Sequence, residues 1–237
     1  MTPDYLNTPL GDLARSIPGA TRVFHSHRLD FCCNGHVTLA EAANRKQISA
    51  QAVSDELSHL QTGSTTDTDW RQASPSALIE HILERYHDTH REQLPELIRL
   101  ARRVEQVHGQ RPNCPNGLAD HLDNMQQELE SHMLKEEKIL FPMLIEGQHS
   151  AAAGPVTVMR FEHDQHGESL EELMRLTNDI TPPAGACNTW QALYRGLDEF
   201  RQDLMQHIHL ENNILFTFSP RIADEPANSC CSVCSGK

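Results

Sequence analysis

Apolar residues recur every three to four positions along most of the chain, a spacing typical of amphipathic helices with one buried face. Four long patterns of this kind follow one another, at 76–107, 117–144, 155–180 and 189–218. Short connections rich in Pro, Gly and Asn separate them. Long helices joined by short connections predict an antiparallel four-helix bundle.

Two prolines fall within these patterns. Pro95 lies inside the first one, where it is expected to kink or divide the helix. Pro155 stands at the start of the third one and suits the first turn of a helix.

The segments on either side of the bundle have a different character. Residues 1–60 contain only short helical patterns, which predict a small helical N-terminal domain, with Thr38 and Ser49 placed to cap two of its helices. Small polar residues come next, and we expect a linker at 61–75 before the bundle of 76–218. The tail at 219–237 has no periodicity and is expected to be mobile. The predicted fold is therefore all-α.

Polar residues interrupt the apolar stripes of the second and fourth patterns. His132 and Glu136 stand four residues apart in HMLKEEKILF, and His207 and Glu211 do so in HIHLENNILF. Residues four apart lie one helical turn apart on the same face, so both members of each pair should point towards the bundle axis. After each glutamate, either of two neighbouring apolar residues, such as Ile139 and Leu140, could be the next one that faces the core.

The first and third patterns share a second motif. HDTHREQL at 87–94 and HDQHGESL at 163–170 both place inward histidines three residues apart. His87 precedes His132 by nearly the same separation as His163 precedes His207. The second helix pair thus repeats the first, and we expect each lone histidine to complete the His–Glu pair that comes after it.

The energetics of burial favour a metal site. An unpaired carboxylate in a bundle core costs several kcal/mol, and two facing carboxylates also repel each other. Two dications remove both costs, with the glutamates as bridges and with positions left for an oxo or hydroxo bridge and a small ligand. Nitrogen and oxygen ligands without thiolate favour iron or manganese over structural zinc. The predicted ligands are His87, His132, Glu136, His163, His207 and Glu211.

Other residues near these ligands are candidates for supporting roles. His90 and His166 are expected to donate hydrogen bonds or to line an access route. Glu128 and Glu162 are candidate acceptors or proton carriers behind the ligands, with a solvated or salt-bridged role equally open. Residues off the inward stripes are expected at the surface; these are His81, His121, Glu137 and His209.

Composition narrows the class of protein. The formal charge of -13 argues against a nucleic-acid surface. We find no apolar run near the length of a membrane span and no signal-peptide pattern, so we expect a cytoplasmic protein. Fifteen histidines in so acidic a chain fit metal binding.

Seven cysteines, an odd number that includes adjacent pairs, argue against a disulfide framework. Cys32 and Cys33 are either ordinary thiols or a redox or metal-contacting pair on an exposed loop. The tail residues Cys230, Cys231 and Cys234 supply too few thiols for a closed zinc site, and their role is left open.

Five segments together resemble the iron–sulfur cluster repair di-iron proteins, or RIC family: LGDLARSIPGATRVFHSHRLDFCCNGHVTLAEAA, RYHDTHREQLPELI, SHMLKEEKILFPM, EHDQHGE and HIHLENNILF. This family joins a cysteine-pair domain to a hemerythrin-like bundle. The resemblance implies two non-heme irons, oxo- and carboxylate-bridged, on the six predicted ligands. It also implies a redox or partner-contact role for Cys32 and Cys33.

The same resemblance implies a function. The protein would restore iron–sulfur clusters damaged by nitrosative or oxidative stress, giving up iron from a labile di-iron centre, with the damaged proteins as partners. Reduction of nitric oxide, or binding of nitric oxide or oxygen, are alternatives that need the same site. Whether the chain is an enzyme, whether it forms a homodimer and what reduces its iron are left open.

Overall fold

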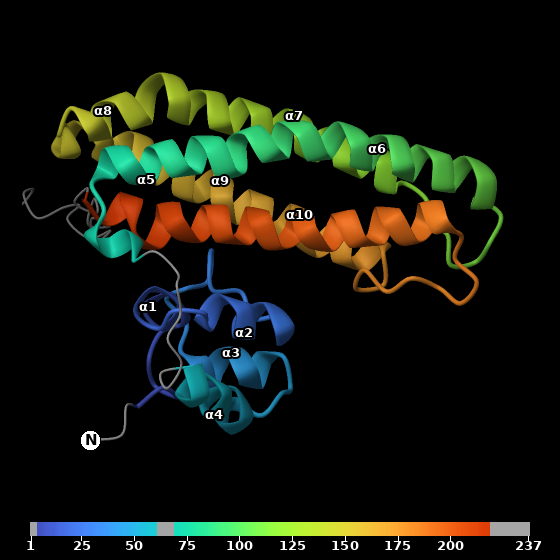
Figure 1. The fold of residues 1–237 in the computed structure, drawn as a ribbon, viewed down its shortest axis with the longest axis horizontal. Coiled ribbons are helices and arrows are strands. Elements are labelled where there is room, and N and C mark those ends of the chain that lie inside the picture. Colours follow the sequence, from blue (N-terminus) through green and yellow to red (C-terminus); the bar gives the residue numbers. More distant parts are fainter. Residues whose placement is uncertain (1–3, 61–68, 219–237) are drawn as a thin grey trace, which may run out of the picture.

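The computed structural model describes residues 4–60 and 69–218 (Figure 1). Within these ranges every regular element is a helix, and the only extended pairing is an isolated bridge between Pro9 and Thr38. The all-α prediction is confirmed. Most of the predicted linker and the whole predicted tail, with its three cysteines, lie outside the described residues.

Four short helices build the N-terminal part: α1 (Leu10–Ser16), α2 (Ala20–Ser26), α3 (Leu39–Arg45) and α4 (Ala50–Leu60). The hydroxyl of Thr38 accepts the Glu41 N–H in a complete capping box, and that of Ser49 accepts the Ala52 N–H. Both predicted caps are confirmed. The fully buried rings of Phe24 and Phe31 lie in the core of this part.

Four long rods form the bundle, and Figure 1 shows them side by side in antiparallel order. A 3-10 turn, η1 (Trp70–Gln72), precedes the first rod. The rods consist of α5 (Pro75–Ile82), η2 (Leu83–His87) and α6 (Asp88–His108); α7 (Leu118–Lys135), η3 (Glu136–Leu140) and α8 (Phe141–Ile145); α9 (His149–Leu176); and α10 (Asn188–Asn213) with η4 (Leu215–Phe218). The N-terminal helices lie against one side of this bundle, where α1 contacts α10.

Neither proline marks a helix boundary. Helix α6 continues through Pro95, held by the buried side chains of Leu94 and Leu97, so the proline does not divide it. Helix α9 starts at His149, and Pro155 lies inside it. The alanines at 151–153, assigned to a connection, favour helix strongly and begin to bury its face.

The regular α-helical spacing of two rods changes instead at two π-helical turns, η2 and η3. A π turn adds a residue to the helical turn and rotates the later part of the helix about its axis. As a result Leu140 is buried while Ile139 is 54 % exposed, which decides between the two candidate positions. Both turns touch the predicted site, because η2 ends at His87 and η3 begins at Glu136.

His209 is buried, so its predicted place at the surface is wrong. Its ring packs edge-on against Phe31 of the N-terminal part, which covers this face of α10. His81 and His121 are half-buried, since His81 stacks on Trp70 and His121 contacts the Ser169 carbonyl. No helix in the described part of the chain is long and apolar enough to cross a membrane.

Candidate metal centre

The structure brings all six predicted ligands together in the bundle core. Each of them is at most 1 % exposed. They come from all four rods: His87 from η2, His132 and Glu136 from the junction of α7 with η3, His163 from α9, and His207 and Glu211 from α10. Apolar clusters border this polar layer on both sides along the bundle.

The six side chains form two overlapping groups that share both glutamates. His87 and His207 form one group with Glu136 and Glu211, and His132 and His163 form the other with the same two carboxylates. The potential ligand atoms within each group lie within 4.8 Å of one another. We call these groups the His87–His207 subsite and the His132–His163 subsite.

The histidine pairing crosses the sequence repeat. His87 was expected to complete the pair His132–Glu136, yet its Nε2 lies 3.2 Å from the Nε2 of His207. His163 likewise pairs with His132, with 3.1 Å between the two Nε2 atoms. Both observed pairings join neighbouring rods, because α6 contacts α10 and α7 contacts α9, although α6 also contacts α7. Each subsite therefore takes one histidine from each half of the repeat.

Each carboxylate turns one oxygen towards each subsite. In Glu136, Oε2 lies 3.5 Å from the His87 Nε2 and Oε1 lies 3.4 Å from the His132 Nε2. In Glu211, Oε1 lies 3.2 Å from the His207 Nε2 and Oε2 lies 3.1 Å from the His163 Nε2. This is the placement that bridging carboxylates require.

These residues fit a pair of metal ions. All four oxygens of Glu136 and Glu211 are buried, and the side chains that face them are the imidazoles of the four histidines. Where those imidazoles are neutral and present a lone pair, each carboxylate charge would cost several kcal/mol without a cation. Two nitrogens bound at right angles to one ion at about 2.1 Å would be about 3.0 Å apart, close to both observed Nε2 separations. The nitrogen and oxygen donors suit iron.

Three ligand histidines have a partner behind them. The Nδ1 atoms of His87, His132 and His163 lie 2.9 Å from Glu137, Glu162 and Asn212 respectively. Such partners fix the ring and leave Nε2 free for an ion. The Nδ1 of His207 is buried with no partner in the described part of the chain.

Comparison with known proteins agrees with this centre. Residues 78–219 match the family described as Hemerythrin HHE cation binding domain, and residues 6–61 match a Domain of Unknown function (DUF542). The iron-sulfur cluster repair proteins YtfE of Yersinia pseudotuberculosis serotype IB (strain PB1/+) and Yersinia pestis (strain Pestoides F) are each 54% identical over 213 residues, 90% of this chain and 96% of theirs. The chain belongs to the family of YtfE iron–sulfur cluster repair proteins. The resemblance stated from the sequence is confirmed.

In this repair-family chain, two glutamates near the ligand candidates have roles that differ from those expected. Glu137 is half-buried and also pairs with Arg91 at 2.9 Å, so its predicted place at the surface is wrong. Glu137 lies within the π turn η3, and a regular helical spacing does not predict where its side chain points. Glu128 is exposed, so it takes the solvated role and not the supporting one. Hydrogen bonds from His132 and then Lys135 lower the pKa of Glu162 to about 2.

His90 and His166 are buried beside the ligands. The rings of His90 and His207 are 5.4 Å apart, and those of His166 and His132 are 5.0 Å apart. Among the described residues neither nitrogen of His90 has a hydrogen-bond partner, and the Nε2 of His166 has none. The structure therefore provides no acceptor for the hydrogen bonds that His90 was expected to donate, and none at the Nε2 of His166.

The cysteine pair does not lie on an exposed loop, contrary to prediction. Cys32 is buried and Cys33 half-buried, with 3.6 Å between their Sγ atoms, and the pair packs against α9. A hydrogen bond with Cys33 and burial raise the pKa of the Cys32 thiol well above its usual range. Sequence reasoning missed Asn212, because nothing in the motif HLENN distinguishes it from a surface asparagine.

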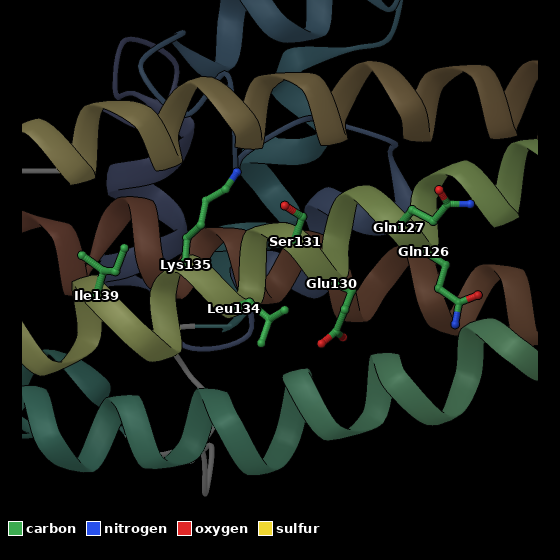
Figure 2. A pocket seen from close by; sticks show the side chains of 7 residues that line it. All are labelled: Gln126, Gln127, Glu130, Ser131, Leu134, Lys135 and Ile139. Carbon is green, nitrogen blue, oxygen red and sulfur yellow. The ribbon is translucent and has the colours of Figure 1, made fainter.

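Two of the cavities among the described residues lie close to the centre without containing its ligand candidates. The first, of about 690 Å³, is a hollow on the outer face of α7 and η3, and Figure 2 shows its lining: Gln126, Gln127, Glu130, Ser131, Leu134, Lys135 and Ile139. The second, of about 480 Å³, opens between the N-terminal helices and the bundle and reaches Tyr86. The Tyr86 ring stacks on His207 at 5.5 Å, so a single side chain separates this second cavity from a ligand.

Proposed function

We propose that this protein repairs iron–sulfur clusters damaged by nitrosative or oxidative stress by supplying iron from a labile di-iron centre. One observation carries the proposal: two fully buried carboxylates, Glu136 and Glu211, have no hydrogen-bond partners within the described residues and face two histidine pairs. The printed names of the relatives support the repair role.

The four histidines together with Glu136 and Glu211 would hold two non-heme irons, with the carboxylates and an oxo group as the bridges. Each subsite offers two imidazole nitrogens and oxygens of both carboxylates, which would leave positions open for a small ligand. When bound, the irons supply exchangeable positions and one-electron chemistry. The chain orients three of its imidazoles through Glu137, Glu162 and Asn212, and it excludes water with the apolar clusters on either side.

The same open positions support a second candidate function. Nitric oxide or oxygen would bind there, and reduction of nitric oxide would use the same two ions. Nitrous oxide formed over many turnovers would favour the reductase, and a stable oxygen adduct would favour a binding protein.

The remaining parts of the proposal concern organisation. We place the N-terminal domain at 1–60, the linker at 61–75 and the hemerythrin-like bundle at 76–218. The proposed partners are proteins with damaged iron–sulfur clusters, met in the cytoplasm. A homodimer is left open.

Metal analysis of three variants tests the centre. His132→Ala and Glu211→Ala should each lower the iron content below two per chain, because each removes a ligand. Glu128→Ala is the matched control, since Glu128 is an exposed glutamate one turn before His132, and it should keep the wild-type iron content. Two irons per chain in both ligand variants would refute the site.

A reconstitution assay tests the repair role. An iron–sulfur enzyme inactivated by nitric oxide should regain activity with the iron-loaded protein and not with the metal-free protein or with Glu211→Ala. Recovery that is equal with metal-free protein would show that the centre is not the iron source.

A further inference from the structure

The N-terminal domain reaches one metal ligand directly. The Cys33 thiol donates a hydrogen bond to the backbone carbonyl of His163 at 3.2 Å. Asn212 makes a second connection: its Nδ2 donates to the Cys32 carbonyl at 3.2 Å, and its Oδ1 lies 2.9 Å from the His163 Nδ1. The cysteine loop, Asn212 and His163 thus form one continuous network.

The chemistry of the imidazole fixes the direction of these hydrogen bonds. The His163 Nε2 faces the carboxylates and needs its lone pair for an ion, so Nδ1 carries the proton and donates to Asn212 Oδ1. The Asn212 amide nitrogen is then free for Cys32. Asn212 is buried, and Arg160 donates to its backbone carbonyl at 2.9 Å, which holds it in place.

This link serves one subsite only. Behind His87 and His132 stand Glu137 and Glu162, which both belong to the bundle. Among the four ligand histidines only His163 has a partner that is hydrogen-bonded to the N-terminal domain in the described structure. A displacement of the cysteine loop should therefore disturb the His132–His163 subsite and leave the His87–His207 subsite in place.

There is little space around the Cys33 sulfur. A Cβ built on Gly167 of α9 would lie 3.3 Å from this Sγ, a tight contact. The helix thus packs directly on the sulfur, and a group attached to the sulfur would have to push the loop away from α9.

We propose that the thiol state of Cys33 sets how tightly the His132–His163 subsite retains its metal ion, with Asn212 as the positioning residue that transmits the effect. The inference rests on the proposed di-iron centre. The modifying agent is a small-molecule disulfide. The Cys33 sulfur forms a new S–S bond to one half of it, the original S–S bond breaks, and the other half leaves as a thiol with the Cys33 proton.

Iron release into excess EDTA tests the route. Asn212→Ala removes the hydrogen bonds to His163 and Cys32, and with them a weaker one of 3.4 Å from Arg160 to Oδ1. Loss of a partner behind a metal-binding histidine typically weakens metal binding about 10–100-fold. We therefore expect one of the two irons to leave faster by that order, and the other to leave at the wild-type rate. Wild-type protein treated with glutathione disulfide should show the same two phases.

Two further variants separate the halves of the network. Asn212→Asp keeps an acceptor for the His163 Nδ1–H and loses the donor to Cys32, so it should retain both irons and no longer respond to glutathione disulfide. Cys33→Ser removes the reactive sulfur, so it should also release iron at the wild-type rate with or without the disulfide. A response of either variant equal to that of the wild type would overturn the proposal.

Asn213→Ala is the matched control. Asn213 is the next residue of α10, and its amide also donates to the cysteine loop, at the Phe31 carbonyl, but its other contact is His209 and not a ligand. It should release iron like the wild type. If it matches Asn212→Ala, general loosening of the interface explains the data. If the wild type never holds two irons, the proposed function fails instead.

Reciprocal coupling provides a test without iron release. If Cys33 modification weakens metal binding, metal binding must disfavour the modification by the same factor. In a Cys32→Ser background at a fixed glutathione disulfide to glutathione ratio, the equilibrium constant for the mixed disulfide at Cys33 should be about 10–100-fold lower in iron-loaded than in metal-free protein. Cys187, which is exposed, is the internal reference. Equal constants at Cys33 would contradict the coupling.

Discussion

The hydrogen bonds behind the four ligand histidines differ more than the histidines themselves. Carboxylates stand behind His87 and His132, and an amide stands behind His163. The Nδ1 of His207 has no hydrogen-bond partner in the described structure, and the rings of Tyr86 and His90 lie beside it. A carboxylate partner makes an imidazole a stronger ligand than a neutral partner does. Residue by residue, the two subsites therefore orient their histidines by different means.

Removal of a carboxylate partner should weaken metal binding. We expect Glu137→Ala and Glu162→Ala each to lower iron affinity about 10–100-fold, and Glu137→Gln and Glu162→Gln to lower it less, because glutamine still accepts the Nδ1–H. Competition with a chelator of known affinity measures this. Glu128→Ala, at an exposed glutamate of the same bundle, is the control. Wild-type affinity in both alanine variants would show that these partners do not support the ligands.

At this scale the sequence predicts which polar side chains meet in the core better than it predicts what surrounds them. A histidine and a glutamate inside an apolar stripe are conspicuous, and the six ligand candidates do meet in the core. Asn212 and Glu137 lie off the inward stripe and are brought to the site by a docked domain and a π turn. Neither cause leaves a periodic signal in the sequence.

Among the elements, the two π turns matter most for the site. Periodicity locates all four rods, but it assumes one residue spacing throughout and so misses η2 and η3. The prolines are also poor guides to the helix ends, because packing along the bundle keeps α6 and α9 helical through Pro95 and Pro155. Single extra residues in helices often mark functional sites, and here both turns carry a ligand candidate.

A one-residue deletion tests the role of η3. Ile139 is exposed, so its loss removes little packing, yet it takes away the extra residue of the π turn. We expect the helical circular dichroism to stay and the iron content to fall, because Glu136 at the start of the turn loses its position. Ile139→Ala keeps the residue count and should keep both irons. Full iron content in the deletion variant would show that the site does not need the π turn.

At the scale of the whole molecule, the docking of the N-terminal domain on α10 buries side chains that the bundle alone would leave at its surface. It covers His209, which the bundle pattern places at the surface, and it brings the cysteine pair against α9. An ion pair of 2.6 Å between Arg28 and Asp179 also joins the two parts. Contacts of this kind join residues far apart in the chain, so helical spacing carries no information about them.

His25 should make the stability of the folded protein sensitive to pH. Its ring packs edge-on against Phe31 at 5.1 Å, and its buried Nδ1 has no hydrogen-bond partner among the described residues. Burial, and then the nearby charge of Arg201, lower the pKa of His25 from 6.5 to about 4. The folded protein therefore keeps this histidine neutral at a pH where the unfolded chain binds a proton.

The sign of the effect is set by the lowered pKa. The contribution of His25 to the free energy of unfolding is fully present above pH 6.5 and is lost as the pH falls towards 4. At pH 5 this amounts to about 2 kcal/mol relative to pH 7.

Urea unfolding at both pH values, compared between wild type and His25→Gln, measures this difference, because glutamine does not titrate. The variant should lose less stability on acidification by about that amount. An equal loss in wild type and His25→Gln would mean that His25 is protonated without cost in the folded protein.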